Sequence, residues 1–149
     1  MAILDERTEF ADATALSTAG TGRALVGDVI DSSVARNVAN GRPLYLVIQV
    51  TTAVTSAGAA TVSFEFVSDA QAAIAVDGTA SMHFASAAIP KATLVAGYKA
   101  VVIALPLEGV AYERYLGVIA NVGTAALTAG AINAFLTTDP NRWKAIASA

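Results

Sequence analysis

The chain has 149 residues, of which 55% are hydrophobic and only 14% are charged, and its formal net charge is −3. It contains no cysteine and one histidine, which excludes disulfides, a thiol nucleophile and a metal site built on several imidazoles or thiolates. Nucleic-acid binding needs clustered lysine and arginine to neutralise phosphates, whereas nine scattered basic residues here face twelve acids. We therefore expect no nucleic-acid partner.

The apolar residues are not gathered into the run of about 20 that a membrane-spanning helix requires. The longest apolar run lies near Ala100–Leu107 and is interrupted by Pro106. We expect no membrane segment, and we place the excess apolar surface partly in a core and partly under other proteins.

The first part of the chain differs in composition from the rest. Six of the twelve acids lie within the first 31 residues, interleaved with Thr, Ser, Ala and Gly. Large apolar residues such as Phe10 and Leu16 are sparse there. We predict an extended N-terminal arm over residues 1–22 and a β-domain over residues 23–149, whose first strand covers residues 24–30.

From Pro43 onward, apolar residues recur at every second position, and Val, Ile, Thr and aromatic residues are frequent. This period is typical of strands that bury one face. The predicted inward residues are Leu44, Leu46, Ile48 and Val50; Val62, Phe64 and Phe66; Met82 and Phe84; Val101, Ile103 and Leu105; Leu116, Val118, Ala120 and Val122; Ile132, Ala134 and Leu136.

Glycine or aspartate separates these runs, as turns require. The turn signals are Ser56-Ala57-Gly58, Asp77-Gly78, Ala96-Gly97, Glu108-Gly109 and Ala129-Gly130. Seven or eight short strands joined by such turns predict an all-β fold, specifically a jelly-roll-like two-sheet β-sandwich.

No residue pattern points to catalysis. His83 alternates outward beside Ser81, and the chain lacks the G-x-S-x-G motif that would present a nucleophilic serine. Glu65, Glu108 and Glu113 are candidates for a glycosidase pair, but a solvated or ion-paired acid is the more frequent role of such residues. We predict that the protein is not an enzyme and has no catalytic, cofactor-binding or metal-binding residues.

Protein contacts are the more favoured use of the remaining residues. Tyrosine, tryptophan and arginine are common interface anchors, and several lie near turns or the C-terminus. The predicted interface residues are Phe10, Asp12, Leu16, Tyr112, Tyr115, Arg142 and Trp143. A carbohydrate-binding platform would use similar residues, so a carbohydrate- or receptor-binding β-sandwich stays open as the alternative.

Several stretches, in order along nearly the whole chain, resemble the jelly-roll capsid cement proteins of short-tailed bacteriophages, the type described for a Bordetella phage. The matching stretches are Phe10-Ala11-Asp12-Ala13-Thr14-Ala15-Leu16, Gly41-Arg42-Pro43-Leu44-Tyr45-Leu46-Val47-Ile48-Gln49-Val50, Gly58-Ala59-Ala60-Thr61-Val62-Ser63-Phe64, Arg114-Tyr115-Leu116-Gly117-Val118 and Thr128-Ala129-Gly130-Ala131-Ile132-Asn133-Ala134-Phe135-Leu136, followed by Asp139 and Trp143.

The resemblance implies a structural protein that binds the outer face of an HK97-type capsid shell and bridges neighbouring major capsid protein subunits. It implies a place on the virion surface after synthesis in the host bacterial cytoplasm, with no small-molecule substrate or cofactor. We also expect self-association as a dimer or trimer, because so little charge should leave apolar strand edges exposed.

Overall fold

A computed structural model describes residues 5–38 and 41–141. In chain order the elements are the 3₁₀ helix η1 (Glu6–Thr8) and the strands β1 (Glu9–Ala15), β2 (Gly22–Asp31), β3 (Tyr45–Thr55), β4 (Thr61–Asp69), β5 (Ser81–Ala85), β6 (Ile89–Pro90), β7 (Lys99–Ala104), β8 (Tyr115–Gly123) and β9 (Ala129–Thr137). Within this part of the chain, no helix is long and apolar enough to cross a membrane.

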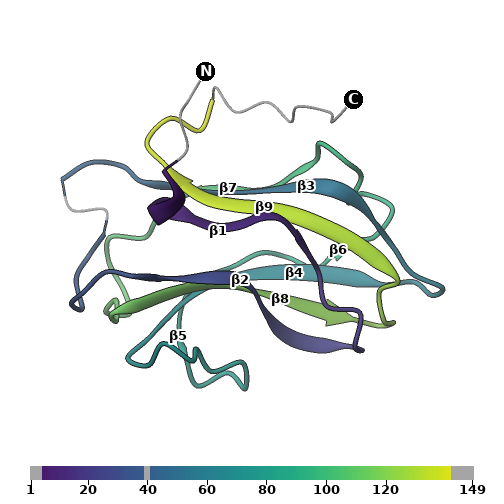
Figure 1. Ribbon diagram of the computed structural model, residues 1–149, viewed down its shortest axis with the longest axis horizontal. Helices are drawn as coiled ribbons and strands as arrows, with labels where there is room; N and C mark the ends of the chain where they lie inside the picture. Colours follow the sequence, from purple (N-terminus) through teal and green to yellow (C-terminus); the bar gives the residue numbers. More distant parts are fainter. Residues whose placement is uncertain (1–4, 39–40, 142–149) are drawn as a thin grey trace.

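The strands form two sheets that face each other (Figure 1). One sheet has the order β1-β9-β3-β7, and the other has the order β2-β8-β4-β5 with β6 also pairing with β4. All pairs are antiparallel, and most connections cross from one sheet to the other. This arrangement, with the first and last strands adjacent, confirms the predicted jelly-roll-like sandwich.

The core between the sheets is made by the alternating apolar residues. Both long central strands contribute: Leu46, Ile48 and Val50 from β3, with Phe64 and Phe66 from β4, are fully buried in one cluster. The predicted inward residues of β7, β8 and β9 lie in or against the same cluster. Each large side chain that is fully buried there contributes about 1.5–3 kcal/mol to stability.

Strand β5 departs from the predicted alternation. The register between β4 and β5 shifts between the pairs Phe66–Phe84 and Val67–Met82. Because a bulge places consecutive residues on the same side, His83 joins Phe84 on the inner side, and its ring centroid lies 5.9 Å from that of Phe66. Met82 is instead an exposed residue, so the inward assignment of Met82 and the outward assignment of His83 are both wrong.

The N-terminal segment is part of the sandwich rather than a separate arm over its described length. β1 pairs with β9, and Phe10 is only 1% exposed, with its ring edge-on to Phe66 at 6.0 Å between centroids. Leu16, just after β1, is also buried in the core. The sequence does not predict this strand, because it contains few large apolar residues. Its pairing with β9 is also irregular, so the apolar residues do not alternate over a long enough stretch to be recognised.

One predicted turn is also misplaced. Ala129 and Gly130 begin β9, and the connection from β8 is made by the preceding residues 124–128. Gly130 is needed there for space, because a side chain at this position would press on Val54 of β3. Close approach of two strands, rather than a turn, explains this glycine.

Candidate functional site

Three of the predicted interface residues are buried and serve the core. Phe10 and Leu16 pack between the sheets, and Tyr112 is only 9% exposed. These three side chains are therefore unavailable as contacts on the surface, and their assignment as interface anchors is wrong. Arg142 and Trp143 lie outside the described residues.

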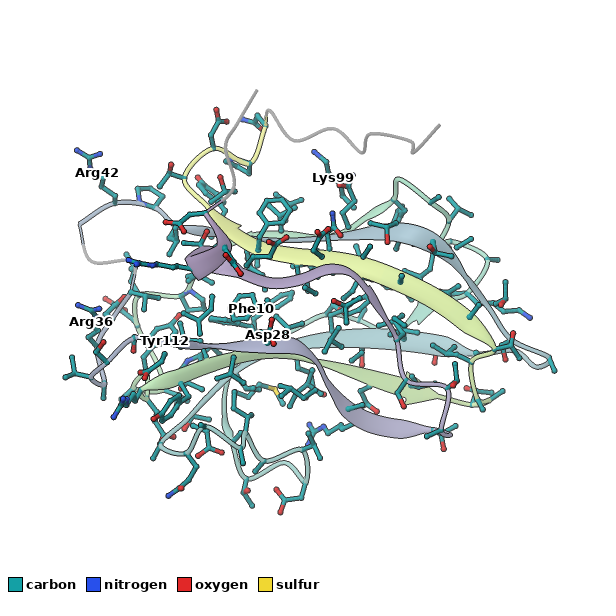
Figure 2. All side chains as sticks on the ribbon, viewed as in Figure 1. Phe10, Asp28, Arg36, Arg42, Lys99 and Tyr112 are labelled. Carbon is teal, nitrogen blue, oxygen red and sulfur yellow. The ribbon has the colours of Figure 1, made fainter. Side chains whose placement is uncertain are left out.

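Asp12 is exposed and lines an open acidic depression of about 460 Å³. Glu6, Glu9 and Asp28 also line it. Asp28 lies at the side of the molecule where the edge strands β1 and β2 meet (Figure 2). The pKa of Glu9 is raised, mainly by burial and to a smaller extent by the negative charges of Asp12 and Glu6. The sequence does not predict this depression, because it arises from the pairing of two edges across the sandwich.

The two edge strands come together at Gly27. This residue has a φ of +68°, and a Cβ there would overlap the carbonyl of Phe10. Only glycine allows both the left-handed backbone and the close contact. In the described part of the chain, no group of three or more His, Asp or Glu side chains is arranged to hold a metal ion.

His83 lies in a small polar cluster beneath the loop that connects β7 to β8. Its Nε2 is 2.7 Å from the hydroxyl of Ser68, which also accepts the backbone N–H of Glu113 at 2.9 Å. Since that hydroxyl already accepts one bond, its own proton is free to go to a neutral imidazole. Burial lowers the pKa of His83, and the charge of Glu113 opposes the shift.

This serine, histidine and glutamate do not have the geometry of a nucleophilic triad. The Ser68 side chain is fully buried, and the Glu113 carboxylate accepts a hydrogen bond from Ser81 at 2.7 Å. A triad needs an accessible serine and an acid that orients the far nitrogen of the imidazole. The cluster instead ties β4 and β5 to the loop between β7 and β8.

Tyr112 fixes the shape of the same loop. Its ring stacks on His83 with centroids 3.9 Å apart and planes 11° apart, and its hydroxyl donates to the carbonyl of Pro106 at 2.8 Å. Burial raises the pKa of Tyr112 to about 12. The tyrosine therefore braces the loop from within, in place of the surface contact that the sequence predicts.

Of the remaining candidates, Tyr115 is partly exposed and lies under Arg114, whose guanidinium carbon is 4.9 Å from the ring centroid. Arg114 also donates two hydrogen bonds to Asp31, both of 2.7 Å. This pairing lowers the pKa of Asp31 to about 2. The Tyr115 ring thus packs against the Arg114 guanidinium, which Asp31 holds in place.

The candidate carboxylates for hydrolysis have separate partners. Glu65 faces away from the core, as predicted, and is ion-paired with Arg23, whose Nε lies 3.1 Å from Oε2. Glu113 is hydrogen-bonded to Ser81, and Glu108 is exposed in its loop. Among the described residues, these acids do not share a partner or line the depression described above.

One end of the sandwich exposes large aliphatic residues that the sequence does not single out. We define the loop end as residues 32–38, 41–44 and 105–111. Val34, Leu107 and Val110 are 57%, 60% and 55% exposed there. Their only sequence signal is an apolar residue inside a loop rather than at an alternating strand position.

The fold and these contacts define the protein as an antiparallel jelly-roll-like β-sandwich with braced loops. The sequence matches the model of the Bbp16 family over residues 10–136. Because this covers most of the chain, the protein belongs to the Bbp16 family, which is named after a Bordetella phage protein. The chain is therefore a member of a phage-related family. No curated protein matches it.

Proposed function

We propose that the protein is a capsid cement protein that binds the outer surface of a bacteriophage head and stabilises it by bridging major capsid protein subunits. Membership in the Bbp16 family over residues 10–136 is the observation that carries this proposal. The resemblance of the sequence to phage cement proteins and the braced β-sandwich fold agree with it.

The mechanism is linkage between binding and assembly. A protein that binds the assembled shell more tightly than free subunits stabilises the shell in proportion to the free energy of occupancy. If one unit contacts several subunits, the second contact forms at high effective concentration and adds avidity. Self-association of the protein as a dimer or trimer increases the number of contacts per unit in the same way.

The carbohydrate-binding alternative loses part of its support. It relied on Tyr112, Tyr115 and Trp143 as an exposed aromatic platform, yet Tyr112 is buried against His83 and Tyr115 lies under Arg114, while Trp143 lies outside the described residues. The Tyr112 ring is therefore unavailable for stacking on a sugar, and one face of the Tyr115 ring is covered by a guanidinium.

The test uses purified protein and phage shells that lack it. Added protein is expected to co-sediment with the shells and to raise their melting temperature, increasingly with concentration. Bovine serum albumin at the same concentration is the control. Shells that remain bare and melt at an unchanged temperature, at protein concentrations on the order of micromolar, contradict the proposal.

A further inference from the structure

The strongest unexplained feature of the surface is the loop end, where three segments from different parts of the chain are joined. Leu105 donates its backbone N–H to the carbonyl of Leu44 at 2.8 Å, and the Asn37 side chain donates to the carbonyl of Leu107 at 3.3 Å. Val38 packs against the core and anchors the first segment. The loops therefore form one supported surface.

The outward side chains of this surface are mostly aliphatic. Val34, Leu107 and Val110 each expose more than half of their surface, although their loops are held from beneath. Exposed aliphatic residues grouped in this way are typical of a site that another protein covers. Because Tyr112 and the hydrogen bonds already order the loops, binding costs little additional conformational entropy.

The charged side chains of the loop end favour a partner surface that carries negative charge. Arg36 and Arg42 are exposed at this end (Figure 2), and neither has an ion-pair partner within residues 5–38 and 41–141. The same segments contain one acid, Glu108, so they are net positive in a chain of net charge −3. By contrast, Arg23 and Arg114 are both paired with carboxylates.

We propose that the loop end is the surface that docks on the capsid shell, and that it contacts an acidic, partly apolar patch of the capsid subunits. The inference rests on the proposed function and assigns the contact to Val34, Leu107, Val110, Arg36 and Arg42. The arginines select the acidic surface and orient the protein on it. The aliphatic residues exclude water from the contact and supply affinity.

A protein surface fits the loop end better than nucleic acid does. Single-stranded nucleic acid is bound on aromatic platforms, whereas the exposed large side chains here are aliphatic. Binding to duplex DNA relies on many phosphate contacts, and two arginines beside a glutamate provide few.

Two double variants test the contact on shells that lack the protein: Leu107→Asp/Val110→Asp and Arg36→Glu/Arg42→Glu. Each is expected to bind the shells at least about tenfold more weakly than the wild type, as the loss of a central interface residue does. The matched controls are Val95→Asp, which changes a residue that is 52% exposed, and Lys99→Glu. The backbone N–H of Val54 donates to the carbonyl of Leu94, at the end of β3 opposite the loop end. Val95 therefore lies well away from the loop end. Both controls are expected to bind like the wild type.

The outcomes separate this inference from the proposed function. If the wild type binds the shells and both double variants bind equally well, the loop end is not the contact, although the protein is still a cement protein. If the wild type itself does not bind, the proposed function fails. Circular dichroism and denaturation midpoints verify that each variant is folded.

Two further measurements identify a different occupant. Loss of a dimer or trimer by the free double variants in sedimentation assigns the loop end to self-association and overturns the inference. Binding of phage DNA by the wild type that the arginine variant abolishes also overturns it. Unchanged sedimentation together with weaker shell binding supports it.

Discussion

The interior of the sandwich and the loop end both contain large apolar residues, but the surroundings of these residues are opposite. In the interior, residues such as Phe66 are fully buried among partners from both sheets, whereas Leu107 at the loop end is 60% exposed. The first arrangement stabilises the fold, and the second adds little to stability. The exposure of apolar residues at the loop end fits the proposed contact with another protein, because grouped exposed apolar residues often mark such contacts.

The largest expected effect is in the interior. Phe66→Ala removes a ring that contacts Phe10, His83 and Tyr112, and we expect it to lower the free energy of unfolding by about 3–5 kcal/mol. Chemical denaturation measures this loss. Val102→Ala, on the exposed face of edge strand β7, is the matched control and should change stability by less than about 0.5 kcal/mol. Equal losses in the two variants would remove the contrast between interior and surface.

A smaller effect is expected where the edge strands meet. Gly27→Ala places a methyl group against the Phe10 carbonyl at a φ of +68°, and we expect a loss of about 1–3 kcal/mol. Gly109→Ala is the control, because Gly109 also has a positive φ of +110° but has open space around it. A thermal melt in which both variants lose the same stability would attribute the effect to backbone strain alone.

The next effect depends on pH and concerns the cluster beneath the loop end. Because burial lowers the pKa of His83 in the folded state, the unfolded chain binds its proton more readily. The contribution of His83 to stability is therefore full above its unfolded pKa of about 6.5 and is lost as the pH falls through the lower folded pKa. Wild type should lose more stability between about pH 7.5 and 5 than His83→Gln does, as measured by denaturation at each pH. Parallel losses would show that His83 does not contribute.

The smallest effect on stability is expected at the loop end itself. Leu107→Asp/Val110→Asp should change the free energy of unfolding by no more than about 0.5 kcal/mol per site, because both side chains are already in water. The same variant is expected to lose shell binding. The interior variants are a poor test of shell binding, because they also reduce stability. A large loss of stability here would mean that these residues support the fold instead.

Much of the sandwich is predictable from the sequence because alternation directly reports a buried face. Phe64, Phe66 and Val118 occupy the expected inner side, since regular antiparallel pairing preserves the period of two. The pattern fails where pairing is irregular. His83 turns inward at a register shift in β5, and Phe10 lies on a strand whose pairing with β9 shifts twice.

The candidate site was harder to predict, because it depends on which loops come together. Tyr112 looks like a surface anchor from its place near a turn, yet the stacking on His83 draws it inward. Conversely, Val34 and Leu107 are separated by more than 70 positions, and only the fold brings their loops to one end. Residue type and spacing in the sequence do not predict that these two loops lie at the same end of the sandwich.

The most direct test of the proposed function is a cryo-electron microscopy map of shells incubated with the protein. We predict density for the two-sheet sandwich on the outer surface, spanning the junction between capsid subunits, with the loop end facing the shell. Bare shells, or density confined to the interior, would contradict the role as a cement protein.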